Sequence, residues 1–175
     1  MTLPLGAEAP PFELPGVDGG NHSLEEYSDV PALVVIWSCN HCPYVQAWEE
    51  RMVELQRDYA DRGVRLVAIN SNDVDRYPAD SFEAMQKRAR ERGFNFDYLF
   101  DGDQSVGRAY GAERTPEVFL FDRARTLVYH GAIDDSYEEE NVSARYLRDA
   151  LDALADGREP PLAETPPVGC TVKWR

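Results

Sequence analysis

The feature that most constrains the fold is a pair of cysteines, Cys39 and Cys42, between an apolar run and a helical pattern. The run at residues 32–37 is continuous and rich in β-branched side chains, which is typical of a strand buried on both faces of a parallel sheet. After Pro43, apolar residues recur every three or four positions as far as Tyr59, the spacing of an amphipathic helix. The sequence therefore predicts a strand, a tight turn that carries both thiols, and a helix.

This position suits thiol chemistry, because unpaired amides and the helix dipole at a helix N-terminus stabilise a thiolate. Two intervening residues let the two sulfurs join across one turn. The first cysteine of such a pair is expected to be the exposed attacker, and the second resolves the mixed disulfide. We therefore predict Cys39 as the nucleophile and Cys42, in the first helical turn, as the resolving thiol. His41 is predicted to tune the pair by stabilising the thiolate, and the alternative is a surface imidazole with no special role.

A second candidate element is Thr115-Pro116, which stands just before a predicted strand. If this peptide bond is cis, the turn lies beside Cys39 and offers backbone groups to which an extended cysteine peptide can add as a strand. Arg114 then biases which substrates approach, or it is simply solvated. Trp37 is predicted to line the approach groove, and the alternative is that it completes the buried strand.

The rest of the chain predicts an α/β domain. The further elements are a hairpin at 12–14 and 22–24, a strand at 64–69, a helix opened by a capping box at 80–83 and ended at Gly93, an extended segment at 94–100, a short helix at 104–110, strands at 118–121 and 127–129, and a helix at 143–155. Their order predicts a central mixed sheet flanked by helices.

The chain resembles the thioredoxin superfamily through Trp-Ser-Cys-Asn-His-Cys-Pro at 37–43, the long helix after it, and the later Thr-Pro before a strand. The N-terminal segment at 9–14 resembles the alkyl hydroperoxide reductase/thiol-specific antioxidant (AhpC/TSA, redoxin) branch. The Gly-Cys-x-x-Lys-Trp tail at 169–174 is similar to that of small redoxin-like proteins. The resemblance extends over residues 3–155. It implies a thioredoxin fold, a cis bond before Pro116, and dithiol–disulfide exchange through Cys39 and Cys42.

Two departures from the family patterns matter for the chemistry. Thioredoxins carry a buried aspartate six residues before the first cysteine, where this chain has Leu33. The proton route is therefore open to water, His41 or another carboxylate. Peroxiredoxins place a hydroxyl residue three positions and a proline seven positions before their cysteine, where this chain has Ile36 and Ala32. Efficient peroxidase activity through Cys39 is therefore not expected.

The length of 175 residues predicts one domain. We assign residues 1–158 to a thioredoxin-like domain with an N-terminal hairpin extension, and 159–175 to a proline-rich C-terminal tail. Val172 and Trp174 predict that this tail docks. Cys170 is either a packed or free thiol, or it forms a second disulfide with Cys39 or Cys42 as an internal reductant or lock.

The charge balance excludes several partners. Eighteen basic against 32 acidic residues give a net charge of −14, which disfavours nucleic acids and anionic membranes. Such acidity suits either a high-salt cytosol or a GC-rich genome. The start of the chain has no basic and apolar leader pattern, and the run at 32–37 is too short to span a bilayer, so we expect a cytoplasmic protein. Three cysteines there predict redox or metal chemistry.

We therefore predict a thiol–disulfide oxidoreductase that acts on protein or small-molecule disulfides without a cofactor. A reductase or a low-molecular-weight thiol would supply its electrons. The alternatives are a peroxide reductase that uses the same pair, and a redox sensor or soft-metal carrier that binds through Cys39, His41 and Cys42. No metal is assigned. The direction stays open, because His41 favours oxidation or isomerisation and a cytosolic setting favours reduction.

Overall fold

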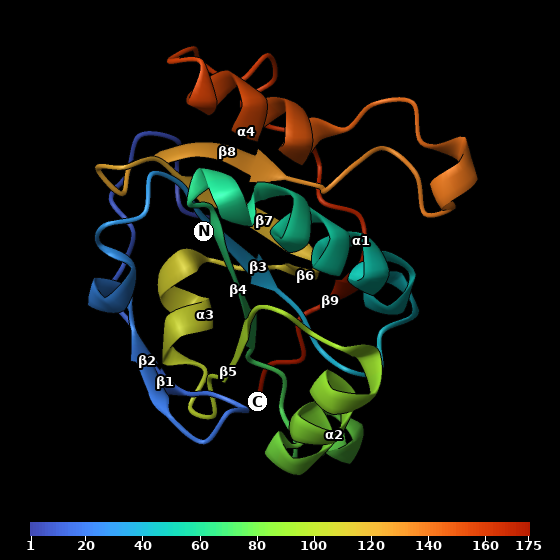
Figure 1. The fold of residues 1–175 in the computed structure, drawn as a ribbon. Helices are drawn as coiled ribbons and strands as arrows, with labels where there is room; N and C mark the ends of the chain where they lie inside the picture. The colour runs from blue at the N-terminus through green and yellow to red at the C-terminus, as the bar shows by residue number, and fades with distance from the viewer.

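A computed structural model describes residues 1–175 and has a five-stranded mixed sheet at its centre (Figure 1). The strand order is β5-β4-β3-β7-β8, with β3 parallel to β4, β4 parallel to β5, and β7 antiparallel to both β3 and β8. The five strands are β3 (Leu33–Trp37), β4 (Arg65–Asn70), β5 (Asp97–Phe100), β7 (Glu117–Phe121) and β8 (Leu127–Gly131). The predicted mixed sheet is therefore confirmed.

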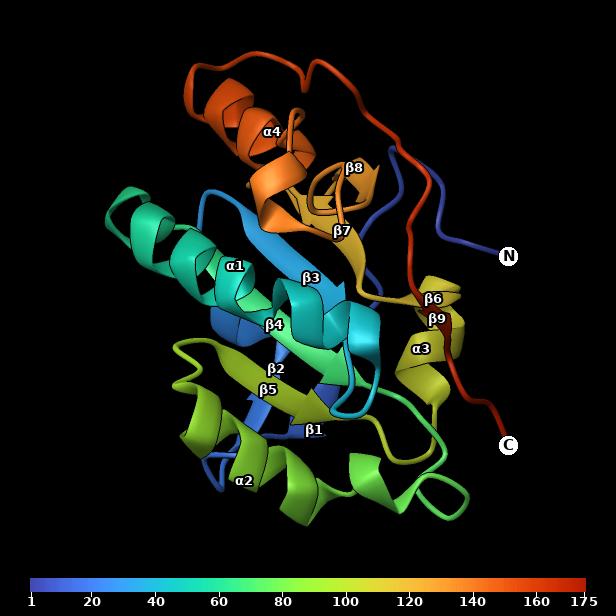
Figure 2. The ribbon, with the colours of Figure 1, turned by 90° about the vertical axis from the view of Figure 1, so that its right-hand side faces the viewer.

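Helices cover both faces of this sheet. They are α1 (Pro43–Tyr59), α2 (Phe82–Arg92), α3 (Ser105–Tyr110) and α4 (Tyr146–Ala155), with short 3-10 turns η1 (Leu24–Tyr27), η2 (Ala60–Arg62), η3 (Pro78–Asp80) and η4 (Glu139–Asn141). Side chains of α1, α2 and α4 form one apolar cluster with the sheet, and those of α3 join the N-terminal segment in a second cluster. Helices α1 and α3 lie on opposite faces of the sheet (Figures 1 and 2). None of these helices combines the length and apolar character that crossing a membrane requires.

Strand β3 is buried on both sides, as its composition predicts. Val34 and Ile36 face the cluster with α1 and α4, and Trp37 faces the cluster with α3. Because β7 runs antiparallel to β3, the end of one strand meets the start of the other, and Trp37 pairs with Glu117. The segment just after β3 and the segment just before β7 therefore meet at one edge of the sheet.

Four short strands complete the chain. Strands β1 (Glu13–Pro15) and β2 (Asn21–Ser23) form the predicted hairpin. Strand β6 (Arg114–Thr115) pairs with β9 (Cys170–Thr171) of the C-terminal tail, which runs back along the domain (Figure 2). Val172 is buried, and the Trp174 ring lies 4.5 Å from the guanidinium of Arg108. The predicted docking of the tail is confirmed, and the boundary between residues 158 and 159 stays a prediction.

Two predicted helix starts are wrong. The last helix begins at Tyr146 and not at 143, because the Ser143 N–H and hydroxyl both donate to Asp135. The predicted capping box at 80–83 does not form. Ser81 is the N-cap of α2, and its hydroxyl accepts from the Ala84 N–H. Asp80 makes its hydrogen bonds to the cysteine turn instead.

An ion pair between α1 and α2 yields a stability prediction. Glu49 accepts two hydrogen bonds of 2.6 Å from Arg88, and the side chains are 6% and 17% exposed. Replacing Arg88 with Met leaves a buried carboxylate without its partner, so Arg88→Met is expected to lower the free energy of unfolding by about 3 kcal/mol in urea titrations. Lys87→Met breaks only an exposed 3.8 Å pair and serves as the control, with a change within about 0.5 kcal/mol. An equal loss of unfolding free energy in Arg88→Met and Lys87→Met would contradict a stabilising role for the Glu49–Arg88 pair.

A buried histidine makes stability depend on pH. His130 Nε2 lies 2.6 Å from Glu117, and Nδ1 lies 3.3 Å from Glu164. Burial lowers the pKa of His130, but the hydrogen bonds with Glu117 and Glu164 outweigh it and raise the pKa above 6.5. The stabilisation is therefore complete below pH 6.5 and is lost as the pH rises through the raised pKa. We expect the stability difference between wild type and His130→Gln to shrink with rising pH in denaturant titrations, and a constant difference would contradict the proposed linkage.

Candidate active site

The two thiols of the turn lie side by side at the start of α1. Cys39 follows β3, and Cys42 is the N-cap residue of α1 with Pro43 in the first turn. Both cysteines are free, and they form a small apolar cluster with Val45. Cys42 therefore sits just before the helix and not within its first turn, and it lies where the helix offers its unpaired amides.

Both sulfurs are shielded from solvent. Cys39 is 1% exposed and Cys42 is 0% exposed, so the expected exposure of Cys39 is wrong for this conformation. The partly buried Cys170 packs against their cluster, and the tail strand β9 lies along β6 beside them. Access to Cys39 by a visiting molecule therefore requires a movement of the chain around it.

The Thr115-Pro116 peptide bond is cis, as the family resemblance implies. It places Thr115 against both thiols: its hydroxyl lies 3.8 Å from Cys39 Sγ, and its carbonyl accepts from the Cys42 thiol at 3.5 Å. Glu117 fixes this loop, since its carboxylate accepts the backbone N–H of Glu113 at 2.7 Å and that of Arg114 at 2.8 Å. The backbone of Thr115 is therefore held within reach of the pair.

The two thiols titrate as a unit. A hydrogen bond from the Cys39 thiol, with further ones from Cys170 and the Val45 backbone, outweighs burial and holds the pKa of Cys42 well below its usual value. The same hydrogen bond, together with burial and the negative charge of Asp80, raises the pKa of Cys39. With the tail docked, these contacts therefore favour a thiolate on Cys42 over one on Cys39, whereas the helix N-terminus was expected to favour it on Cys39.

The geometry also accommodates the opposite arrangement, in which Cys42 is the thiol and Cys39 is the thiolate. When the proton is on Cys42, its thiol donates to the Thr115 carbonyl, and a Cys39 thiolate can accept from the Thr115 hydroxyl. The two thiols pack in one cluster, so the proton has only to pass from one to its neighbour. The contact with the Thr115 hydroxyl therefore favours the form of the pair in which the negative charge is on Cys39.

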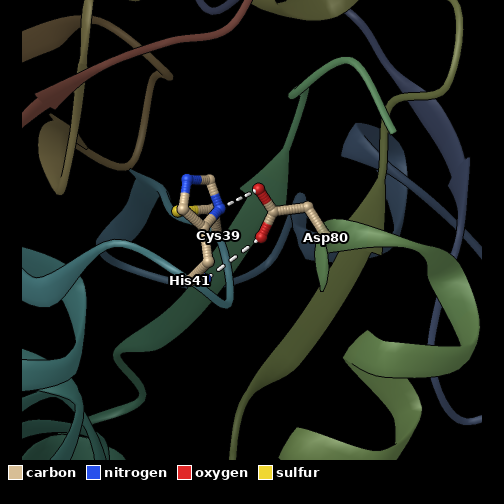
Figure 3. A group of neighbouring side chains, drawn as sticks. All are labelled: Cys39, His41 and Asp80. Atoms are coloured by element: carbon tan, nitrogen blue, oxygen red, sulfur yellow. Dashed lines mark hydrogen bonds and ion pairs between the residues drawn. The ribbon is translucent and has the colours of Figure 1, made fainter. Parts of the chain in front are cut away.

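Asp80 is the site residue that the sequence did not reveal. It is fully buried, and Oδ1 accepts the backbone N–H of Asn40 at 2.7 Å and that of His41 at 3.2 Å (Figure 3). Oδ2 accepts from the Asn72 amide at 2.9 Å and from His41 Nδ1 at 2.5 Å. Asp80 is the last residue of the 3-10 turn η3, 38 positions after Cys42, and no local pattern links it to the cysteines. A buried carboxylate therefore lies beside Cys39, although the chain has Leu33 at the family's aspartate position.

His41 connects this carboxylate to the thiols and to solvent. Because a carboxylate only accepts, Nδ1 carries the proton and Nε2 is left free to exchange one. One ring nitrogen, Cys39 Sγ and an Asp80 oxygen all lie within 4.8 Å of one another. Figure 3 shows the three side chains grouped at the turn. The ring stacks on Tyr77 with centroids 5.4 Å apart, and 29% of the side chain is exposed. This arrangement offers the thiol pair a proton route, and the tuning role of His41 stays a prediction.

Cys39, His41 and Asp80 are also residue types that bind metal ions. The Asp80 oxygens, however, already accept four hydrogen bonds from protein groups. An ion would have to displace the contacts that hold the turn. The donor set therefore fits a hydrogen-bond network better than a metal centre.

The other two predicted substrate-binding residues differ in their placement. Trp37 is fully buried, donates to the Ser71 hydroxyl at 2.9 Å and packs against Tyr110 and Phe119. The prediction that it lines an approach groove is therefore wrong, because the alternation of β3 directs the indole into the core. Arg114 is exposed on β6, and its guanidinium lies 3.5 Å from the Gly169 carbonyl of the tail.

The sequence positions that bind peroxide in peroxiredoxins carry no hydroxyl here. Ile36 lies within β3 and Ala32 just before it, and both are buried in the apolar cluster with α1. A hydroxyl beside Cys39 comes only from Thr115, in the loop before β7. The site therefore has the elements of thiol–disulfide exchange and lacks the peroxide-binding pattern.

Known structures resemble the whole chain. A conserved protein from Geobacillus kaustophilus is 45% identical, with a TM-score of 0.93, and the match covers 98% of this chain and 93% of that one. A hypothetical protein from Sinorhizobium meliloti is 40% identical, with a TM-score of 0.94, and the match covers 100% and 97%. A thioredoxin domain of a Bacteroides vulgatus thiol-disulfide oxidoreductase is 16% identical, with a TM-score of 0.64 over 74% of this chain and 89% of that one, and shares the fold.

Among curated relatives, the thiol-disulfide oxidoreductase ResA of Geobacillus thermodenitrificans is 29% identical over 70% of this chain. The match spans 66% of that relative, just under two thirds of its length. The thiol:disulfide interchange protein DsbE of Yersinia pestis is 25% identical over 82% of this chain and 73% of its own length. The model of the AhpC/TSA family matches residues 5–130. The chain is a thioredoxin-fold protein and belongs to the AhpC/TSA family.

Proposed function

We propose that this protein is a thiol–disulfide oxidoreductase whose redox centre is the Cys39/Cys42 pair. One observation carries the proposal: two neighbouring thiols at the start of a helix face the backbone of a cis-proline turn. A helix N-terminus stabilises a thiolate, and an exposed backbone edge can hold an extended peptide. Together they provide a nucleophile and a means of presenting a disulfide to it.

In the proposed reaction, the Cys39 thiolate attacks one sulfur of a substrate disulfide. The substrate S–S bond breaks, a Cys39–substrate disulfide forms, and the leaving sulfur takes up a proton. Cys42 then attacks Cys39 Sγ, which releases the second substrate thiol and forms the Cys39–Cys42 disulfide. The Thr115 hydroxyl stabilises the attacking thiolate, and His41, held by Asp80, exchanges protons with solvent.

The substrate is a disulfide in a protein or a small molecule, and a reductase or low-molecular-weight thiol returns the pair to the dithiol. The names of the relatives support this class of reaction, since both ResA and DsbE are described by thiol–disulfide chemistry. Peroxide reduction receives no such support from the site, because neither Ile36 nor Ala32 can bind a peroxide through a side-chain hydroxyl. The cytoplasmic location expected from the sequence stays a prediction.

The proposal predicts different outcomes for the two cysteines of the pair. In the reduction of insulin by dithiothreitol, Cys39→Ser is expected to lose the protein-dependent rate, because the thiol that attacks the substrate disulfide is gone. Cys42→Ser is expected to accumulate a mixed disulfide between Cys39 and an insulin peptide, detectable by non-reducing electrophoresis and mass spectrometry. Dithiothreitol alone gives the background rate. Wild-type turnover in Cys39→Ser would exclude the proposed function.

The Asp80 charge predicts a shift in thiol reactivity. The pKa of Cys39 is raised by its hydrogen bond with Cys42, by burial and by the negative charge of Asp80. In a Cys42→Ser background, Asp80→Asn should therefore move the pH midpoint of Cys39 alkylation downward by about one unit. Asp152→Asn is the matched control, since Asp152 lies on α4 and pairs with Tyr59 at the far end of α1. An unchanged or higher midpoint in Asp80→Asn would contradict the electrostatic role.

A further inference from the structure

The C-terminal tail occupies the edge at which a substrate peptide would add. Strand β9 is antiparallel to β6, with Cys170 opposite Thr115 and Thr171 opposite Arg114 (Figure 2). The Val172 N–H donates to the Glu113 carbonyl at 3.0 Å and continues the ladder. This is the backbone pairing that strand addition of an extended peptide uses.

The register of this pairing brings Cys170 to the redox pair. Thr115, its partner in the ladder, contacts Cys39 through its hydroxyl and Cys42 through its carbonyl. The Cys170 side chain packs against the cluster of Cys39, Cys42 and Val45. Cys42 interacts with the thiols of both Cys39 and Cys170, and the Cys170 thiol in turn interacts with Cys42. Three sulfurs are thus in contact, with Cys42 in the middle.

The approach of the tail requires a glycine before Cys170. A Cβ at Gly169 would lie 2.0 Å from the Thr115 carbonyl oxygen, a distance that no side chain can occupy. The segment after Cys170 is anchored as well. The Asp73 N–H donates to the Lys173 carbonyl at 2.8 Å, and the Lys173 N–H donates to Asn72 at 2.9 Å. The sequence and the anchoring of the tail therefore match close pairing with the edge of β6.

We propose that the segment 169–172 is an internal substrate of the redox centre, and that Cys170 is a third redox-active cysteine that exchanges disulfide bonds with Cys42. The inference rests on the proposed function, because a Cys39–Cys42 disulfide must first form. It assigns to Cys170 the place that a cysteine of an extended protein substrate would take. An external substrate then has to displace the tail before it reaches Cys39.

The exchange step needs no further oxidant. The Cys170 thiolate attacks Cys42 Sγ of the Cys39–Cys42 disulfide, the bond between Cys39 and Cys42 breaks, and a Cys42–Cys170 disulfide forms. The proton lost by Cys170 ends on Cys39, so one disulfide and one thiol are present before and after the step. Burial and the hydrogen bond with Cys42 raise the pKa of Cys170 while the pair is reduced. Oxidation of Cys42 removes its negative charge, which favours the attacking thiolate.

Disulfide mapping tests the chemical part of the proposal. Reduced wild type and Cys39→Ser are equilibrated in glutathione buffers of stepped redox potential, quenched with acid, alkylated, digested and analysed by mass spectrometry. We expect a Cys42–Cys170 cross-link in Cys39→Ser and both Cys39–Cys42 and Cys42–Cys170 disulfides in wild type. Glutathione adducts on Cys42 and Cys170 without a cross-link between them, at every potential, would overturn the proposal.

A pair of glycine variants tests the occupancy of the edge. Gly169→Ala introduces the clash with Thr115 and should undock the tail, which we expect to raise the alkylation rate of reduced Cys39 by about tenfold or more. Gly20→Ala is the matched control, because its added Cβ meets only Asp18 and His22 at 3.6 Å or beyond, which is ordinary contact. An alkylation rate in Gly169→Ala equal to that of the control would show that the tail does not restrict access.

The insulin assay separates a failure of this inference from a failure of the proposed function. Faster insulin reduction by Gly169→Ala than by Gly20→Ala supports an internal substrate that competes with the external one. If wild type reduces insulin and no Cys42–Cys170 disulfide forms, the function stands and the inference fails. If the cross-link forms but neither wild type nor Gly169→Ala reduces insulin, the proposed function fails, and with it the role of the tail as a substrate mimic.

Discussion

The site depends on the contacts of one residue, Thr115, at the turn before β7. Its hydroxyl faces Cys39, its carbonyl accepts from Cys42, and its backbone pairs with Cys170. This is possible because β3 and β7 are antiparallel neighbours, so that the end of one strand adjoins the start of the other. The cis peptide bond and the buried Glu117 carboxylate hold the turn in place. The thiol pair, the backbone edge of β6 and the C-terminal tail are therefore all joined through Thr115.

Different groups set the pKa values of the two thiols at the turn. The start of α1 and neighbouring thiols favour a thiolate on Cys42, whereas the buried Asp80 carboxylate disfavours one on Cys39. Asp80 also binds the backbone of Asn40 and His41 and orients the His41 ring. The same carboxylate thus shapes the turn and sets where the negative charge resides. A site of this kind couples its redox state to proton transfer, because each exchange step moves a thiolate from one sulfur to another.

Much of this arrangement was predictable from local patterns. The two-residue spacing of Cys39 and Cys42 between a β-branched run and an amphipathic helix predicted the strand–turn–helix unit, and the family resemblance implied the cis bond before Pro116. The helix boundaries near 80 and 143 were wrong. Asp80 and Ser143 were expected to begin α2 and α4, but each makes its side-chain hydrogen bonds to another segment of the chain. Such contacts override capping preferences. The indole of Trp37 was misplaced for a similar reason, since a strand buried on both faces gives no sign of which face a side chain takes.

The sequence by itself determined the kind of unit that the chain forms, because hydrophobic periodicity and turn chemistry act over a few neighbouring residues. It also determined that no peroxide-binding hydroxyl precedes Cys39, since this is a matter of residue identity. Only the tertiary structure decided that the Asp80 carboxylate lies beside Cys39, that both thiols are buried, and that Cys170 packs against them. These contacts join residues about 40 to 130 positions apart. Strand order and register create such proximity, and no local pattern in the chain encodes it.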